Sequence, residues 1–128
     1  MTKQNINILV AKFGWSEEQI FLGLRAKFQC EYCNKDMFKD VDNYKLWQVD
    51  HIIPQSAPVK NFEHNSIENL AISCRQCNVN FKSNFNVGNI LGYEAGRQEY
   101  ISYLREYVYK NRELQQIKLE IMKLNFTE

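Results

Sequence analysis

The chain has 128 residues, of which 45% are hydrophobic and 24% are charged, and its formal net charge is +1. Such a length predicts one domain, and the composition is that of a globular protein. No apolar run approaches the ~18 residues of a membrane span, and the start of the chain, MTKQNINILVAKFGW, lacks a signal-peptide pattern. We therefore expect a cytoplasmic protein with no membrane contact. The near-zero charge argues against strong binding of nucleic acid by the chain alone.

A helix is predicted over residues 16–28, with the sequence SEEQIFLGLRAKF. Ser16 and Gln19 have the spacing of a capping box, in which two side chains bind backbone N–H groups at a helix start. Apolar residues then recur every four positions, as on one face of a helix, at Ile20, Leu24 and Phe28. The helix is expected to run directly into the turn of a first cysteine pair.

Two strands and a helix are predicted in the middle of the chain. KLWQVDHII predicts a strand because Trp47, Val49 and His51 alternate with polar residues, and NLAIS predicts a second strand. We expect Trp47 and Val49 in the core. Residues 54–66, PQSAPVKNFEHNS, form a long loop between the strands, and a loop of this length in a small domain is usually functional. The segment CRQCNVNFKSNF predicts a helix that begins near a second cysteine pair.

The C-terminal segment from Glu94 to Leu124 contains a single helix breaker, Gly96, near its start. Its apolar residues form two stripes that are one residue out of phase, so we expect a kinked pair of helices or one helix with two buried faces. Either both stripes pack on the same domain, or the second one serves a partner protein or a second copy of the chain. The first stripe is Ile101, Leu104 and Val108, and the second is Leu114, Ile117, Ile121 and Leu124.

The four cysteines form two Cys-x-x-Cys pairs, CEYC and CRQC. Structural disulfides fit poorly without a secretion signal, and a thioredoxin-like motif would need a βαβ unit that is not predicted here. The spacing predicts one tetrahedral zinc site with two ligands from each pair. Four thiolates leave no open position for water, so such a zinc ion would be structural. The predicted ligands are Cys30, Cys33, Cys74 and Cys77.

Three fragments, in this order, resemble the HNH endonuclease family of ββα-metal nucleases: CEYC, then VDHIIP, then SIENLAISCRQCN. The resemblance covers residues 30 to about 83. It implies an α+β fold with a small ββα-metal core, in which a two-stranded antiparallel hairpin is joined to a helix. We expect a single domain of residues 1–128, with this core at 30–84, an N-terminal helical extension at 1–29 and C-terminal helices at 85–128.

The resemblance also implies roles for individual residues. His51 would be the general base that activates water, and Asn69 would brace the loop and position that histidine. Asp50 and Asn78 would bind a catalytic Mg²⁺ or Mn²⁺ ion. With asparagine at the third motif position, the chain would be an H-N-N variant of the family.

Basic residues after the second predicted strand are candidate phosphate contacts. Positions 69–93 contain no acidic residue, and Arg75 and Lys82 lie in that window. We expect both to contact nucleic acid, with a surface charge beside the second cysteine pair as the alternative for Arg75. Family members often carry a lysine three residues after the third motif position. Phe81 occupies that place here, and Lys82 comes one residue later.

These residue types suit phosphodiester hydrolysis. A histidine with its ordinary pKa of about 6.5 can accept a proton near neutral pH, and carboxylate and amide oxygens are hard donors suited to Mg²⁺ or Mn²⁺. Asp50 and His51 are neighbours, however, and neighbours on a regular strand point to opposite faces. We therefore expect the pleat to break at this pair, or the two side chains to flank the site from two sides.

The leading hypothesis is a metal-dependent DNA endonuclease that leaves 5′-phosphate and 3′-hydroxyl ends, as the resemblance implies. One alternative is a non-catalytic zinc module that binds nucleic acid or protein. Another is a nuclease subunit of a larger complex, such as a defence or mobility system. An isolated Asp–His pair is usually a hydrogen-bonded surface contact, but Asn69, Asn78 and the cysteine pairs favour catalysis. We expect His64, the other histidine, to be a solvated loop residue.

Overall fold

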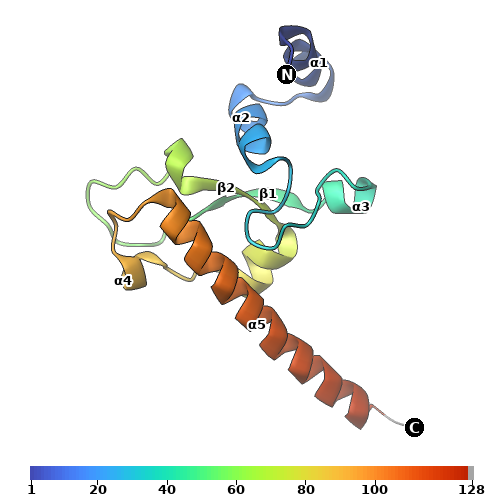
Figure 1. Ribbon diagram of the computed structural model, residues 1–128, viewed down its shortest axis with the longest axis vertical. Coiled ribbons are helices and arrows are strands. Elements are labelled where there is room, and N and C mark those ends of the chain that lie inside the picture. The colour runs from blue at the N-terminus through green and yellow to red at the C-terminus, as the bar shows by residue number, and fades with distance from the viewer. Residues whose placement is uncertain (127–128) are drawn as a thin grey trace.

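A two-stranded antiparallel sheet lies at the centre of the computed structural model, which describes residues 1–126 (Figure 1). The strands are β1 (Trp47–His51) and β2 (Leu70–Cys74), and Trp47 pairs with Cys74 and His51 with Leu70. This mixed architecture confirms the predicted α+β class. The helices are α1 (Lys3–Phe13), α2 (Glu17–Ala26), α3 (Val41–Tyr44), η1 (Ile67–Asn69), η2 (Gln76–Lys82), α4 (Gly88–Leu91) and α5 (Arg97–Asn125).

The predicted first helix forms, but its inward face differs from the prediction. Ser16 caps α2, and both hydrogen bonds of the capping box with Gln19 are present. Leu22 is fully buried, whereas Leu24 is 47% exposed. The predicted stripe is wrong because α2 ends at Ala26 and the chain then reverses, which places the Phe28 ring against Gly23. A side chain at Gly23 would collide with that ring. A further helix, α1, precedes α2 and buries none of its residues.

The core lies around β2, in which every residue is buried. Helix α2 contacts β2 from one direction, and η2 contacts both β2 and α5. Trp47 and Val49, which were expected in the core, are partly buried and pack against it. The Trp47 ring stacks on Trp15 with a centroid distance of 5.4 Å. The core is therefore small, and β2 is its most enclosed element.

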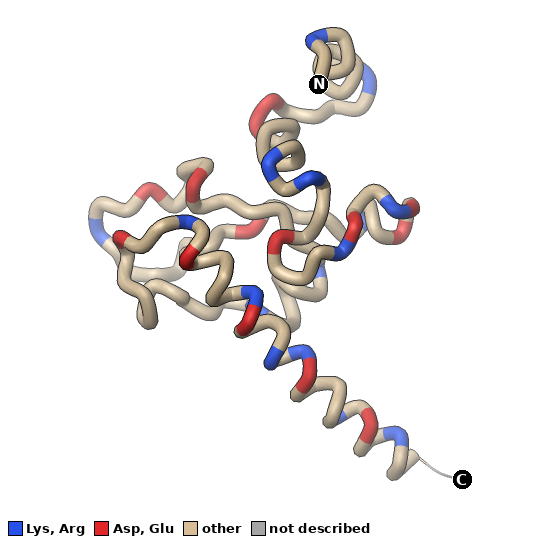
Figure 2. The backbone as a smooth tube through the Cα atoms, viewed as in Figure 1, with Lys and Arg blue, Asp and Glu red and all other residues tan. Residues whose placement is uncertain are grey.

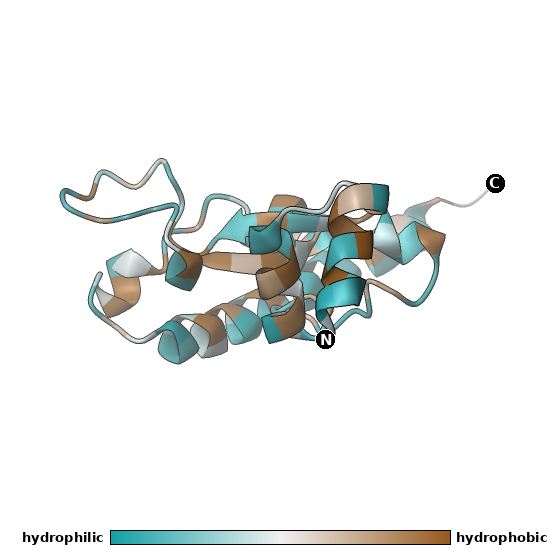
Figure 3. Ribbon diagram, turned by 90° about the horizontal axis from the view of Figure 1, so that it is seen from above, coloured by the Kyte–Doolittle hydropathy of each residue, from teal (hydrophilic) through white to brown (hydrophobic). Residues whose placement is uncertain are grey.

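The chain between β1 and β2 is a long loop, as expected. It reaches outward from the sheet and is mostly hydrophilic (Figure 3). Its first residues, Ile52 and Ile53, are fully buried, and its last turn is η1. The loop is thus tied down at both ends, next to the ends of the two strands.

Helix η2 is a π-helix rather than an α-helix. The Ser83 N–H donates to the Asn78 carbonyl at 3.0 Å, a hydrogen bond that closes over five residues instead of four. Such turns are rare and frequently lie at functional sites. The hydrogen bond in η2 therefore spans one residue more than it would in an α-helix.

Helix α5 is one continuous helix of 29 residues, not a kinked pair. At 1.5 Å per residue it spans about 43 Å, and its C-terminal part projects away from the sheet (Figure 1). Of the two alternatives for the apolar stripes, packing of both on the same domain is wrong, because the second stripe is exposed. Among residues 1–126, no helix is long and apolar enough to cross a membrane. The buried positions of α5 are Tyr100, Ile101, Leu104 and Val108, and the exposed ones are Leu114, Ile117, Ile121 and Leu124.

Candidate active site and cysteine cluster

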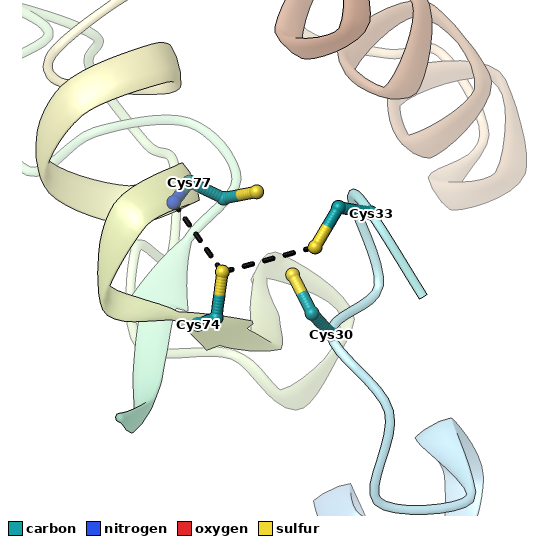
Figure 4. Close-up of side chains that lie close together, drawn as sticks. All are labelled: Cys30, Cys33, Cys74 and Cys77. Carbon is teal, nitrogen blue, oxygen red and sulfur yellow. Dashed lines mark hydrogen bonds between the residues drawn. The ribbon is translucent and has the colours of Figure 1, made fainter. Parts of the chain in front are cut away.

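The four cysteines converge on one point between two chain segments (Figure 4). Their sulfur atoms all lie within 4.8 Å of one another, and Cys33 Sγ lies 3.8 Å from Cys74 Sγ. A tetrahedral zinc ion with Zn–S bonds of about 2.3 Å requires sulfur atoms about 3.8 Å apart. The cluster can therefore hold a metal ion.

Asp50 is a buried carboxylate with two donors on one of its oxygens. Its Oδ2 atom accepts a hydrogen bond of 2.7 Å from the Tyr32 hydroxyl and lies 3.0 Å from Lys82 Nζ. Burial, followed by the nearby charge of Asp50, raises the pKa of Tyr32 well above its ordinary value. Tyr32 is thus a neutral donor, and Asp50 Oδ1 has no hydrogen-bond partner among residues 1–126.

Lys82 lies in a different place from the one predicted. Its side chain is 0% exposed and forms the ion pair with Asp50, so it does not present its charge to a phosphate at the surface. Its Nζ atom also donates to the His51 carbonyl at 3.0 Å. Lys82 lies at the end of the π-helix η2, and its side chain faces β1 although it comes one residue later than the spacing that the resemblance implies. Arg75, by contrast, is exposed at the start of η2, as a phosphate contact would have to be.

His51 is the last residue of β1, and its ring is fixed by the loop. Its Nε2 atom lies 2.8 Å from Asn65 Oδ1. An amide oxygen can only accept a hydrogen bond, so Nε2 carries the hydrogen and Nδ1 is the proton-accepting atom of the neutral ring. Gln55 Nε2 donates to the same Asn65 oxygen at 3.4 Å. The loop therefore sets both the orientation and the tautomer of this histidine.

Asn78 faces β1 from the first turn of η2. Its Nδ2 atom donates to Gln48 Oε1 at 2.7 Å, and Gln48 lies on the same face of β1 as Asp50. With the amide nitrogen held in this way, the side-chain oxygen Oδ1 of Asn78 is the atom that remains for a cation. Gln48 thus orients a predicted metal ligand, a role that the sequence did not suggest.

Asn69 holds the two ends of the loop together. Its Oδ1 atom accepts from the Ile53 N–H at 2.8 Å, and its Nδ2 atom donates to the carbonyls of Ile53 and His64 at 3.0 and 2.8 Å. The side chain is buried and every one of these partners is a backbone group. The Asn69 side chain makes no hydrogen bond to the His51 side chain, so we expect any effect on that histidine to pass through the loop.

Asp50, His51 and Asn78 border one hollow of about 320 Å³. The predicted break of the pleat does not occur, because β1 and β2 pair regularly as far as His51. Asp50 and His51 point to opposite faces of β1, and both border the hollow because it lies at the end of the strand. Ser56, Ser83 and Asn84 add polar atoms to its lining. The hollow thus combines a carboxylate, an amide and an imidazole, which can bind a hard cation and accept a proton.

Sequence comparison gives the family of this region. The model of the HNH endonucleases matches residues 30–83. The match confirms the resemblance inferred from the motifs and covers less than half of the chain. It includes both cysteine pairs, Asp50, His51, Asn69 and Asn78. No curated protein matches the chain, and no solved structure does.

Three side chains that hydrogen-bond to predicted site residues were not themselves predicted from sequence: Tyr32, Gln48 and Asn65. Each acts on a predicted residue through one hydrogen bond, with Asp50, Asn78 and His51 as the respective partners. The one signal in the sequence was the position of Tyr32 inside CEYC. A residue between two metal ligands has a fixed backbone, so its side chain can hold a neighbouring group in place. His64 is partly buried and packs on Phe62, so it is not the solvated residue that we expected.

Proposed function

We propose that this chain is a metal-dependent DNA endonuclease of the HNH type with its catalytic centre in the hollow at the end of β1. The observation that carries the proposal is the convergence of Asp50, His51 and Asn78 on that hollow, within the segment that matches the family. HNH endonucleases act on DNA, and both the residue types and their arrangement suit hydrolysis of a phosphodiester.

His51 is proposed as the general base. Its Nδ1 atom accepts a proton from water while Asn65 holds Nε2, so the ring keeps one orientation during the transfer. Asn69 maintains the loop that carries Asn65, and Arg75 contacts a DNA phosphate from the exposed start of η2. The products are a 5′-phosphate and a 3′-hydroxyl, as in the family.

Asp50 and Asn78 are proposed to hold one Mg²⁺ or Mn²⁺ ion, each through an oxygen that makes no hydrogen bond to residues 1–126. Two protein oxygens leave the other positions to water and phosphate, which is the coordination that Mg²⁺ favours. When bound, such an ion stabilises the charge that develops on the leaving oxygen. We further propose that the cysteine cluster holds Zn²⁺ as a structural ion, because its sulfur spacing fits a closed tetrahedral site.

A plasmid-cleavage assay tests this function. Purified protein should nick supercoiled plasmid with Mg²⁺ or Mn²⁺, and EDTA should stop the reaction. His51→Ala should lower the nicking rate by about 10²–10⁴-fold, since that is the usual contribution of a general base. His64→Ala is the matched control and should keep the activity, because His64 is the other histidine of the chain and does not border the hollow.

The zinc content and the circular dichroism spectrum of His51→Ala should equal those of the wild type. Full activity in this variant would contradict the assignment of the base. A wild-type protein that binds plasmid but does not nick it with any divalent metal would favour the non-catalytic binding module.

The exposed half of α5 favours a second candidate, a nuclease subunit of a larger complex. Leu114, Ile117 and Ile121 lie along one side of this helix end, all more than half exposed, and Met122 and Phe126 are exposed as well. Lys and Arg are interspersed with Glu along the same stretch, so its charge is mixed (Figure 2). An apolar helix end of this kind suits a partner protein.

Light scattering of the purified chain distinguishes the possible partners. A concentration-independent monomer would leave this surface for a different protein, whereas a dimer that Ile117→Glu dissociates would assign it to a second copy of the chain.

A further inference from the structure

We propose that Tyr32 is a positioning residue that couples the cysteine cluster to the catalytic cation through Asp50. This inference rests on the proposed function, because it concerns the carboxylate to which we assign the cation. It adds a side-chain connection between the two sites, which the backbone also joins through the consecutive residues Cys77 and Asn78.

Tyr32 occupies an unusual position, with Cys30 and Cys33 on either side of it. The backbone forms a tight turn here, in which the Asn34 N–H donates to the Cys30 carbonyl at 2.8 Å and the Cys30 N–H to the Lys35 carbonyl at 2.9 Å. The side chain is 2% exposed. A metal ion on the two flanking sulfurs therefore fixes the base of a tyrosine whose ring extends into the core.

The hydroxyl of Tyr32 reaches Asp50 Oδ2 at 2.7 Å, across a gap of 18 residues in the sequence. Lys82 Nζ lies 3.0 Å from the same oxygen. A carboxylate turns about a single bond, and two donors on one oxygen determine where the other oxygen points. Tyr32 and Lys82 together thus leave Oδ1 for a cation in the hollow that Asp50 shares with His51 and Asn78.

The two donors are not equivalent, because they belong to different parts of the fold. Lys82 sits at the end of η2 and has a flexible four-carbon side chain. Tyr32 has a rigid ring and moves with the turn between Cys30 and Cys33. Loss of the metal from the cluster would release that turn and withdraw a hydrogen bond from the carboxylate. The cluster therefore supports catalysis through one identifiable hydroxyl as well as through overall stability.

Tyr32→Phe tests the coupling, because it keeps the ring and removes only the hydroxyl. Hydrogen-bonding partners of metal ligands typically contribute 10–100-fold to metal affinity, so we expect Mn²⁺ to bind about tenfold more weakly. Affinity is measured without DNA, from the electron paramagnetic resonance signal of free Mn²⁺. The Mn²⁺ concentration that gives half-maximal plasmid nicking should rise by the same factor, with a smaller change in the rate at saturation. Zinc content should remain at the wild-type level.

Tyr100→Phe is the matched control. Tyr100 is also buried, its hydroxyl donates to the Gly92 carbonyl at 2.6 Å, and neither residue borders the hollow. This variant should bind Mn²⁺ like the wild type. A second comparison uses the Asp50→Ala background, in which Tyr32→Phe should weaken Mn²⁺ binding no further if tyrosine acts through that carboxylate.

Wild-type Mn²⁺ affinity in Tyr32→Phe would overturn the coupling, and so would an equal loss with and without Asp50. If Tyr32→Phe loses its zinc, the comparison of Asp50→Ala with the double variant Asp50→Ala/Tyr32→Phe decides. Equal Mn²⁺ affinity of these two proteins would support action through Asp50. A weaker affinity of the double variant would show that Tyr32 acts through general structure. A wild-type protein that neither binds Mn²⁺ nor nicks DNA would instead contradict the proposed function. The two failures are therefore distinguishable.

Discussion

The cysteine cluster and the hollow at the end of β1 are built from the same segments but have opposite chemical character. Cys77 and Asn78 are consecutive residues, yet one contributes a buried sulfur to the cluster and the other faces the hollow. The cluster offers four soft ligands and no vacancy, whereas the hollow offers two oxygens and an imidazole in an open space. One turn of helix thus contributes to both sites, and in the proposed function the closed one maintains shape and the open one leaves room for substrate.

Loss of the cluster should have the largest effect, if its role is to maintain shape. Cys74→Ser removes a ligand that is also the last residue of the fully buried β2. Binding of structural zinc contributes on the order of 10 kcal/mol to the folding of small metal domains, so this variant should lack a cooperative thermal transition. Calorimetry and metal analysis measure both effects. A Cys74→Ser protein that folds without zinc would contradict the role of the cluster in maintaining the fold.

Lys82→Met should have the next largest effect. It leaves the Asp50 carboxylate buried without its counter-charge, and breaking a buried ion pair costs about 3–5 kcal/mol. Urea unfolding measures the loss. The control is Lys110→Met, which breaks an ion pair with Glu106 that is 70% and 67% exposed and should leave stability unchanged. Equal effects of the two variants would contradict the buried pair.

Asn65→Ala should have the smallest effect and should be confined to the hollow. It frees the His51 ring to rotate, and we expect the rate of DNA cleavage under single-turnover conditions to fall by about tenfold. Stability and zinc content should not change, since Asn65 is an exposed loop residue. Asn65→Asp keeps an accepting oxygen and should retain most of the activity. An alanine variant with wild-type activity would show that the histidine needs no support from the loop.

The features predicted correctly from sequence depend on short spacings. The capping box of α2, the position of β1 and the convergence of the two cysteine pairs each depend on a few consecutive residues, and each is confirmed. The alternation predicted for β1 is not, because the buried residue of the strand is the polar Asp50. The motif match is of the same kind, since its fragments keep their order along residues 30–83. Local patterns of this type do not require knowledge of the three-dimensional structure.

The features that were missed depend on which segments meet in space. Lys82 was expected at the surface because its neighbours in sequence carry no acidic residue, but its partner, Asp50, lies on another element. Tyr32 reaches the same carboxylate from the first cysteine pair. The pairing of β1 and β2 stays regular as far as His51, and the hollow lies at the end of the strand. No periodicity in the sequence specifies that position. The exposure of the second stripe of α5 likewise depends on where the core ends.

The π-turn of η2 has a consequence for sequence alignment. A lysine at fixed spacing from the third motif position would be aligned with Phe81, a partly buried residue whose ring lies 4.3 Å from the Arg112 guanidinium. The lysine that meets the strand is Lys82, so only an alignment with a one-residue gap between Asn78 and Lys82 would match it to the lysine that the resemblance implies. Searches that allow this gap would recover chains whose helix carries the same insertion, and searches with rigid spacing would score the basic position as absent.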